Sequence, residues 1–263
     1  MRLSHRNLVS NICQAASTLG FTDDDTSIAV LPFFHAYGMQ ILMNMGLNAG
    51  ATVVTMPRFD LEQFLQLHQQ HGVTRSFVAP PIVLALAKHP LVVSYDLSSL
   101  TQIISGAAPL SAELADEAAT RIGCEVVQGY GMTELTTVAH LPVPGASKPG
   151  SVGVPAPSTE TKIIDPGTGA EVALGTDGEI CIRGPQVMLG YLNNESATRD
   201  MVEPDGWLHT GDIGHLDEDG HLYVVDRLKE LIKYKGFQVP PAELEALLLT
   251  HPAVADAAVV GLP

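Results

Sequence analysis

The stretch TQIISGAAPLSAELADEAATRIGCEVVQGYGMTE (101–134) sets the fold of the chain. Two short apolar runs, TQIIS (101–105) and EVVQG (125–129), flank a helix predicted from Ser111 to Ile122. A strand followed by a helix and a second strand is the unit of a parallel sheet whose faces are covered by helices. The stretch therefore predicts an α/β fold.

The same alternation extends back to the N-terminus. Further strands are predicted in TSIAVLP (26–32), ATVVTM (51–56) and TRSFVAP (74–80), and helices between Ser4 and Gly20, around 41–47, over 61–71 and over 82–87. Five apolar strands separated by helices predict a doubly wound, mostly parallel sheet. Ligands of such sheets bind beyond the carboxyl ends of the strands. The segments that leave those ends are PFFHAYG (32–38), PRFD (57–60), APP (79–81), SGAAP (105–109) and QGYGMTE (128–134).

From about Ser151 the pattern changes to short strands and turns. ETKIID (160–165) and GEICIRG (178–184) are predicted strands, and DPGTG (165–169) and DEDG (217–220) are predicted turns. This part is expected to form a small antiparallel β subdomain packed on the first. A helix is predicted to begin at Pro241, and a last strand in AVADAAVVGLP (253–263).

A basic cluster lies in the segment WLHTGDIGHLDEDGHLYVVDRLKELIKYKGFQV (207–239). The chain holds 14 Lys and Arg against 29 Asp and Glu, yet four basic residues fall within nine positions: Arg227, Lys229, Lys233 and Lys235. Such a cluster indicates an anion, and phosphate attracts Arg and Lys together. Asp212, predicted in a turn with Thr210 and Gly211, could accept hydrogen bonds from the vicinal hydroxyls of a ribose. The alternative is a solvated hairpin with ordinary surface lysines.

Composition excludes several classes of protein. A formal charge of −15 argues against nucleic acid or an anionic membrane as the main partner. Cys13, Cys124 and Cys181 occur singly without metal spacing, which is typical of reduced core residues in a cytoplasmic protein. No apolar run reaches the length of a membrane span. His68 and His71 are predicted on a solvated helix face.

The loops SGAAP and QGYGMTE place small residues where strands end. Small residues let the backbone approach a ligand closely, and exposed amides can bind phosphate or a purine edge. Thr133 adds a hydroxyl suited to a phosphate, and Glu134 adds a carboxylate suited to Mg²⁺ or its water shell. Tight βα turns are the alternative reading. His35 and Tyr37 follow a strand end and could line a pocket, although a lone His is more often structural.

These motifs, in this order, resemble the adenylate-forming acyl-CoA ligases: FHAYG, SGAAPLS, QGYGMTE, GEICIRG, GYL, GWLHTGD and VVDRLKELIKYKGFQVPPAELE. The pattern is most similar to the 4-coumarate–CoA ligases. The resemblance implies that a carboxylic acid, ATP and coenzyme A give acyl-CoA, AMP and pyrophosphate through an acyl adenylate, with Mg²⁺ as cofactor. A medium- or long-chain fatty acyl-CoA synthetase and a non-catalytic nucleotide- or CoA-binding module are the alternatives.

The resemblance also implies roles for individual residues. The nucleotide positions are Ala107, Gln128, Gly129, Tyr130, Gly131, Met132, Thr133, Asp212 and Arg227. Lys235, Gly236 and Arg58 match positions that meet coenzyme A, and Lys233 and Gln238 match residues that approach the adenylate in the thioester step. Lys229 matches the hinge of the C-terminal domain. His35, Tyr37 and Ile41 match acyl-pocket residues. The expected catalytic set is Lys229, Lys233, Thr133 and Glu134, with Glu134 serving Mg²⁺.

Two family features are expected outside these 263 residues. The phosphate loop that ends in Lys–Gly normally lies just before a stretch like RLSHRN, and the adenylation lysine lies near the end of the C-terminal domain. The resemblance thus predicts a middle segment, weakly active or inactive alone. Its expected parts are an α/β subdomain of the large AMP-binding domain (1–150), a β subdomain (151–225), and a hinge with the start of the C-terminal domain (226–263).

Overall fold

The larger part of the molecule is a five-stranded parallel sheet with the strand order β2-β1-β3-β4-β5. The computed structural model describes residues 1–234, 237–249, 251, 254 and 257–261. The strands are β1 (Thr26–Ala29), β2 (Thr52–Thr55), β3 (Arg75–Val78), β4 (Gln102–Ser105) and β5 (Glu125–Gln128). Every neighbouring pair is parallel. The predicted doubly wound α/β fold is confirmed.

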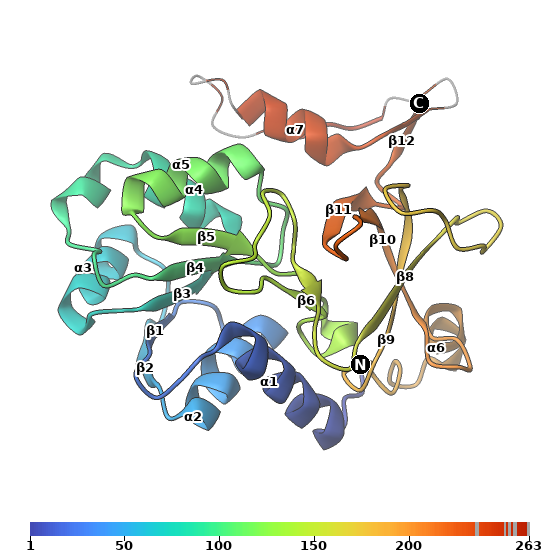
Figure 1. Cartoon of the computed structure of the whole chain (residues 1–263), viewed down its shortest axis with the longest axis horizontal. Coiled ribbons are helices and arrows are strands. Elements are labelled where there is room, and N and C mark those ends of the chain that lie inside the picture. Colours follow the sequence, from blue (N-terminus) through green and yellow to red (C-terminus); the bar gives the residue numbers. More distant parts are fainter. Residues whose placement is uncertain (235–236, 250, 252–253, 255–256, 262–263) are drawn as a thin grey trace.

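Helices cover both faces of this sheet (Figure 1). One face carries α3 (Leu61–His71), α4 (Pro80–Lys88) and α5 (Ala112–Ile122), and the other carries α1 (His5–Leu19), a π-helix (Gly38–Met45) and α2 (Gly46–Ala49). Successive residues of β4 show the division, because Ile103 packs into the first layer and Ile104 into the second. A short 3₁₀ helix (Pro90–Ser94) follows α4.

Side-chain caps and glycines define three of the helices. Ser4, Asp60 and Ser111 each accept a hydrogen bond from a backbone N–H of the first turn of α1, α3 and α5. Each of these helices ends at a glycine in the left-handed conformation: Gly20, Gly72 and Gly123. An N-cap of this kind stabilises a helix by about 1 kcal/mol, and the sequence signals these boundaries locally.

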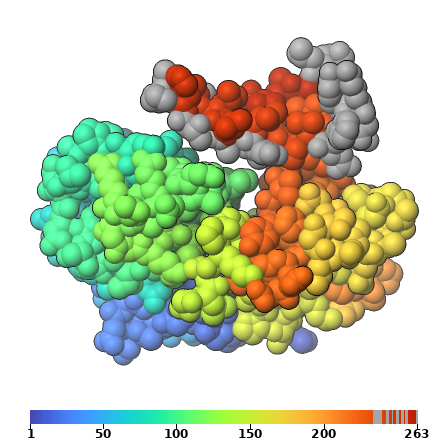
Figure 2. Space-filling model, turned by 45° about the horizontal axis from the view of Figure 1, so that its top comes forward, coloured from blue at the N-terminus to red at the C-terminus, as the bar shows by residue number. Residues whose placement is uncertain are grey.

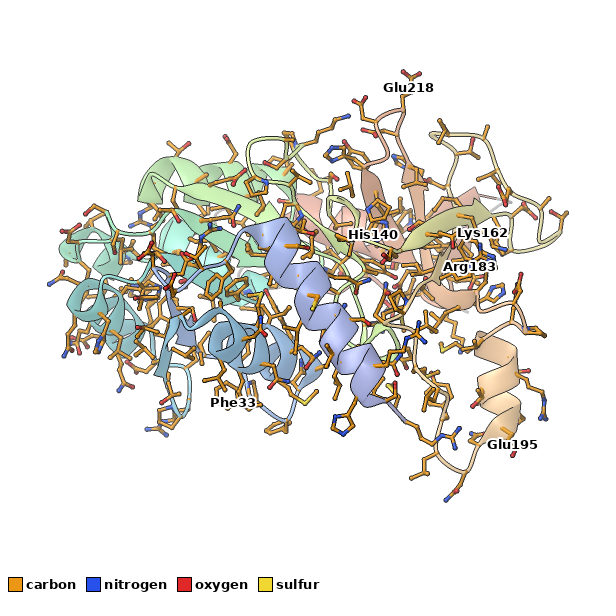
Figure 3. All side chains as sticks on the ribbon, turned by 60° about the horizontal axis from the view of Figure 1, so that its bottom comes forward. Phe33, His140, Lys162, Arg183, Glu195 and Glu218 are labelled. Carbon is orange, nitrogen blue, oxygen red and sulfur yellow. The ribbon has the colours of Figure 1, made fainter. Side chains whose placement is uncertain are left out.

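The second part is an antiparallel sheet with the order β11-β10-β9-β8. Its strands are β8 (Glu160–Ile164), β9 (Gly178–Arg183), β10 (Leu208–Leu216) and β11 (Leu222–Arg227), and β6 (His140–Leu141) pairs with β7 (Val154–Pro155) beside it. On the face that carries Lys162 and Arg183 (Figure 3), both cations lie over the ring of Trp207, at 4.5 and 4.6 Å from its centroid.

Amide side chains of α1 attach this sheet to the first part. Asn7 donates to the carbonyls of Pro185 and Val187, each at 2.8 Å. Asn11 donates to the carbonyl of Val138 at 2.8 Å, and Gln14 donates to that of Pro157 at 2.7 Å. All three amides are buried. The buried side of this amphipathic helix is therefore partly polar, and it fixes α1 against segments more than a hundred residues away.

The C-terminal segment stands above both parts (Figure 2). It contains a hairpin of β12 (Ile232–Tyr234) and β13 (Phe237–Val239), followed by α7 (Pro241–Leu249). The helix predicted from Pro241 is confirmed. Within the described residues of 253–263, namely 254 and 257–261, no strand is present. No helix among the described residues combines the length and hydrophobicity needed to cross a membrane.

Several sequence interpretations are wrong. Of the three cysteines expected in the core, Cys181 is buried, Cys124 is partly buried and Cys13 is exposed. Thr210, Gly211 and Asp212 are not in a turn but inside β10, where the register with β9 shifts between His209 and Ile213. Helix α6 (Glu195–Met201) was not predicted, because seven largely polar residues give no helical periodicity. His68 is fully buried rather than solvated, and its ring bonds the carbonyl of Phe64 and the hydroxyl of Ser76.

Candidate functional site

Two predicted site loops lie side by side at the carboxyl edge of the parallel sheet. Ser105 and Gln128 are paired at the ends of β4 and β5, and the N–H of Gly129 donates to the carbonyl of Ser105 at 3.0 Å. The side chain of Gln128 accepts a hydrogen bond from the N–H of Leu110 at 2.9 Å. Gln128 thus ties the end of SGAAPL to the start of QGYGMTE.

The FHAYG segment contacts the end of β4, the SGAAP loop and Thr137, which lies three residues after QGYGMTE. The hydroxyl of Tyr37 donates to the carbonyl of Ile104 at 3.0 Å, and a Cβ added to Gly106 would lie 3.1 Å from the Tyr37 ring. The hydroxyl of Thr137 donates to the carbonyl of Ala36 at 3.0 Å. Burial raises the pKa of Tyr37 far above its ordinary value, so its hydroxyl keeps the proton that it donates.

The three predicted acid-binding residues differ in exposure. His35 is exposed, next to the exposed Phe33 (Figure 3) and Phe34. Tyr37 and Ile41 are 7% and 2% exposed and belong to the apolar layer beneath the sheet. The segment thus changes from open surface to buried core within a few residues.

A residue in a strained backbone conformation lies within the SGAAP loop, and another lies two residues after QGYGMTE. Ala107 has φ of 73° and Thr136 has φ of 65°, a region that side chains other than glycine rarely adopt. The Thr136 hydroxyl donates to the carbonyl of Gln186 at 2.7 Å and holds it there. Gly131 permits the close return of the chain, since a Cβ at that position would lie 1.6 Å from the carbonyl oxygen of Thr137. Backbone strain of this kind concentrates at functional sites.

Glu134 is held at the rim of these loops by residues of the GYL motif region. It lies in a 3₁₀ turn (Thr133–Leu135). Its carboxylate accepts a hydrogen bond from the hydroxyl of Tyr191 at 2.8 Å, and its carbonyl accepts one from the N–H of Met188 at 2.9 Å. Partial burial, followed by the hydrogen bond to Glu134, raises the pKa of Tyr191 to about 12. Half-buried and oriented, Glu134 offers the hard oxygen ligand that Mg²⁺ prefers.

Asp212 connects the antiparallel sheet to the loops of the parallel sheet. Its Oδ2 accepts a hydrogen bond from the hydroxyl of Tyr130 at 2.6 Å. Its Oδ1 lies 3.6 Å from Nε of Arg227, the residue opposite it on β11. Gly211, at φ of 72°, provides the backbone irregularity that precedes Asp212. A carboxylate, a phenol and a guanidinium therefore meet where the two sheets adjoin.

Burial is the main cause of the pKa shifts of Asp212 and Tyr130. Burial raises the pKa of Asp212, although the hydrogen bond from Tyr130 and the charge of Arg227 act to lower it. Burial followed by the charge of Asp212 raises the pKa of Tyr130 well above its ordinary value. The Asp212 side chain is 15% exposed and that of Arg227 is 70% exposed. The carboxylate thus occupies a recess, while the guanidinium projects into solvent.

The remaining predicted residues lie further along the chain or on other loops. Arg58 is exposed in the bend after β2, and Lys229 is exposed in the turn after β11. Lys233 and Gln238 face each other in backbone register across the β12–β13 hairpin. Lys235 and Gly236 lie outside the described residues.

Known proteins with similar sequences belong to the family that the motifs indicate. The profile of the family described as AMP-binding enzyme matches residues 2–192. The chain belongs to this family.

Curated relatives include the 4-coumarate–CoA ligases. The chain is 51% identical over 264 residues to a probable 4-coumarate–CoA ligase 1 of Dictyostelium discoideum, covering 99% of this chain and 48% of that protein. It is 48% identical to 4-coumarate–CoA ligase 5 of Oryza sativa subsp. japonica, covering 98% of this chain and 50% of that protein. The chain thus spans about half the length of these relatives. The resemblance to adenylate-forming ligases is confirmed.

Solved structures agree with the fold. The ATP-bound MatB of Rhodopseudomonas palustris superposes with a TM-score of 0.92 at 33% identity, over 99% of this chain and 52% of that one. The o-succinylbenzoate CoA synthetase (MenE) of Bacillus subtilis, in complex with its acyl-adenylate intermediate, gives a TM-score of 0.89 at 35% identity, over 99% of this chain and 53% of that one.

Sequence reasoning did not identify every residue that supports the site. Tyr191 orients Glu134, and Thr210 accepts a hydrogen bond from the N–H of Asp212 at 3.1 Å while donating to the carbonyl of Ile180 at 2.8 Å. Tyr191 lies inside the GYL motif, so a signal was present, but its partner is 57 residues away.

Proposed function

We propose that this chain carries the adenylate-binding part of an ATP-dependent carboxylate–CoA ligase, most similar to a 4-coumarate–CoA ligase. The reaction is acid plus ATP plus coenzyme A to acyl-CoA, AMP and pyrophosphate, through an acyl adenylate. The observation that carries the proposal is the Tyr130–Asp212 hydrogen bond of 2.6 Å. It joins the QGYGMTE loop to the HTGD strand, and so unites the two motifs expected to enclose a nucleotide.

The chemistry of this group suits the ribose of AMP. Asp212 has two carboxylate oxygens, and vicinal hydroxyls are donors that a carboxylate binds well. Tyr130 fixes the orientation of the carboxylate, and Arg227 offers a cation beside it. The small residues 105–109 and 129–131 at the adjacent strand ends allow backbone amides to approach the adenine and the α-phosphate.

Thr133 and Glu134 are proposed to serve the phosphates and Mg²⁺. When bound, Mg²⁺ would neutralise phosphate charge during attack by the carboxylate of the acid. Tyr191 holds one oxygen of the Glu134 carboxylate, which limits the orientations of that ligand. Thr133 lies at the start of the same turn and offers a hydroxyl donor to the phosphate.

The residues after β11 are proposed to act in the thioester-forming half of the reaction. Lys229 sits in the turn between β11 and the β12–β13 hairpin, where a hinge between two parts of the protein would lie. Lys233 and Gln238 share one register position of that hairpin and would approach the adenylate together. Arg58, Lys235 and Gly236 are proposed to meet coenzyme A, whose phosphates require cations.

The acid is proposed to bind beside the FHAYG segment. His35 is exposed, while Tyr37 and Ile41 lie beneath it. The apolar character of Tyr37, Met39, Ile41 and Leu42 suits an aromatic or medium-length aliphatic monocarboxylate. A second carboxylate buried there would lack a cationic partner among these residues.

Calorimetric titration of the chain with AMP tests the nucleotide assignment. Asp212→Ala removes charge-assisted hydrogen bonds of about 1.5–3 kcal/mol, so AMP affinity is expected to fall roughly tenfold to a hundredfold. Glu218→Ala is the matched control, because Glu218 is an exposed carboxylate that projects from the tip of the β10–β11 turn (Figure 3). Equal AMP affinity in wild type and Asp212→Ala would contradict the assignment.

Acyl-CoA formation tests the reaction itself. In a protein that carries this sequence together with the family's phosphate loop and C-terminal lysine, 4-coumarate, ATP and coenzyme A are expected to give acyl-CoA and pyrophosphate. A preference for fatty acids would support the fatty acyl-CoA synthetase alternative. AMP binding without acid-dependent pyrophosphate release would indicate a non-catalytic binding module.

A further inference from the structure

A second cluster of chemically reactive side chains lies on the antiparallel sheet, beside the nucleotide site but separate from it. Cys181 on β9 and His209 on β10 occupy one cross-strand register position, and Glu179 lies two residues before Cys181 on the same face. Ligand atoms of these three residues all lie within 4.8 Å of one another. The function proposed above uses none of them.

The distances within the cluster match the coordination shell of a metal ion. Nδ1 of His209 lies 3.0 Å from Oε2 of Glu179 and 3.6 Å from Sγ of Cys181. A tetrahedral Zn²⁺, with Zn–N and Zn–O of about 2.0 Å and Zn–S of about 2.3 Å, separates its N and O ligands by about 3.3 Å and its N and S ligands by about 3.5 Å. Both distances from Nδ1 of His209 therefore lie within a few tenths of an ångström of this geometry, and the Glu179 oxygen and the Cys181 sulfur lie within 4.8 Å of each other.

The surroundings orient these ligands. Nε2 of His209 lies 2.7 Å from Oε1 of Glu203, and metal-binding histidines usually donate their second ring N–H to a carboxylate in this way. Oε1 of Glu179 accepts a hydrogen bond from the N–H of Gly211 at 3.2 Å, which leaves Oε2 facing His209. Cys181 is fully buried, whereas the side chains of His209 and Glu179 are 26% and 11% exposed, so an ion can enter from solvent.

We propose that Glu179, Cys181 and His209 form a binding site for Zn²⁺, with water as the fourth ligand and Glu203 holding the histidine ring. A thiolate with an imidazole selects Zn²⁺ or Co²⁺ over Mg²⁺, which prefers oxygen ligands. The site is thus distinct in chemistry from the Mg²⁺ position proposed at Glu134.

Proton balance follows from the contacts. Without the ion, the two ring nitrogens of His209 face the carboxylates of Glu179 and Glu203, and the ring can donate to both only as an imidazolium. Burial raises the pKa of the Cys181 thiol to about 12, so the thiol is protonated as well. Zn²⁺ replaces the proton on Nδ1 and the proton on Sγ; two protons pass to solvent and no electron is transferred.

Cobalt substitution tests the proposal directly. The chain is purified without a polyhistidine tag, reduced, stripped with a chelator, and titrated with Co²⁺ in excess Mg²⁺. The expected result is one Co²⁺ per chain with a thiolate-to-Co²⁺ charge-transfer absorption that Zn²⁺ abolishes by displacement. Cys181→Ser is expected to lose this absorption. Cys124→Ser, which removes a partly buried thiol at the start of β5, is expected to keep it.

Glu203→Gln covers the case in which Cys181→Ser fails to fold. Glu203 is half-exposed and is not a proposed ligand, and loss of such a supporting carboxylate typically weakens metal binding about tenfold to a hundredfold. Absence of saturable binding, or an absorption that survives in Cys181→Ser, would overturn the site and leave only an ion-paired histidine. Wild-type affinity in Glu203→Gln would overturn the orienting role.

Discussion

At the scale of single residues, two tyrosine–carboxylate pairs hold the acidic groups of the proposed nucleotide site. Tyr130 donates to Asp212 at 2.6 Å across 82 residues, and Tyr191 donates to Glu134 at 2.8 Å across 57 residues. Hydrogen bonds to a charged group contribute about 1.5–3 kcal/mol each. Each pair therefore serves both stability and orientation, because the carboxylate keeps one position before a ligand arrives.

Removing the Tyr130 hydroxyl is expected to affect both properties. Tyr130→Phe leaves Asp212 in its recess without its donor, so the free energy of unfolding should fall by about 1.5–3 kcal/mol. AMP affinity should fall with it, because the carboxylate loses its fixed orientation. Urea unfolding and AMP titration measure the two effects. Tyr223→Phe on β11, whose ring stacks on His215, is the control, and an equal response of both variants would refute the role of Tyr130.

At the scale of elements, the irregular strand β10 determines where Asp212 lies. Its register with β9 shifts between His209 and Ile213, and Gly211 adopts φ of 72° within it. Bulges of this kind re-aim side chains next to active sites. Here the irregularity precedes Asp212, which lies opposite Arg227 and reaches Tyr130.

Substitution of two glycines, one next to Asp212 and one remote from it, distinguishes the loss of stability caused by backbone strain from an effect on the proposed site. Gly211 and Gly220 both have positive φ, 72° and 80°, and a Cβ at either meets nothing within 4 Å. A valine forced into this conformation should cost about 1–2 kcal/mol at each position. Gly211→Val is expected to weaken AMP binding as well, since it shifts Asp212, whereas Gly220→Val should only lower stability. Thermal unfolding and AMP titration distinguish the two, and unchanged AMP affinity in Gly211→Val would refute the role of the bulge.

Most elements could be predicted from the sequence because their signals are local. The cap at Ser4, the stop at Gly20 and the apolar run 101–105 each need only their neighbours to be interpreted. Strand β10 was misread because Gly211–Asp212 is typical of turns, and its pairing with β9 and β11 depends on distant residues. The contact of Lys235 and Gly236 with coenzyme A stays a prediction.

The motifs of the candidate site could be recognised in the sequence, but the contacts between their side chains could not. Small residues after strands and Asp212 upstream of a basic cluster pointed to a nucleotide, and the family resemblance then assigned the individual candidate residues. The Tyr130–Asp212 bond and the Glu179–Cys181–His209 cluster arise from tertiary pairing. Cys181 and His209 are 28 residues apart and meet only through the β9–β10 register.

At the scale of the whole molecule, two buried histidines make stability depend on pH. His68 lies on α3, where it bonds Ser76 of the parallel sheet, and its pKa is lowered to about 4 by burial. His140 lies centrally, near the antiparallel sheet (Figure 3), where it bonds the Thr161 hydroxyl at 3.0 Å, and burial lowers its pKa to about 3. Both histidine side chains are therefore neutral in the folded chain near pH 7.

Acid is therefore expected to destabilise the chain before most carboxylates titrate. An unfolded histidine has a pKa of about 6.5, so below that value the unfolded state binds more protons and the free energy of unfolding falls. The stability from each neutral histidine is complete above pH 6.5 and is progressively lost as the pH falls toward the folded pKa. At pH 5 the loss should be about 2 kcal/mol for each histidine.

A variant pair on one helix isolates this effect from the change in net charge. His68→Gln removes the buried titration, whereas His71→Gln removes an exposed histidine three residues further along α3. Urea unfolding at pH 7 and pH 5 should show that wild type and His71→Gln lose similar stability. His68→Gln starts from a lower value at pH 7, because it disturbs the bonds to Phe64 and Ser76, but should lose about 2 kcal/mol less on acidification. The same pH dependence in all three proteins would show that His68 is not held neutral in the folded chain.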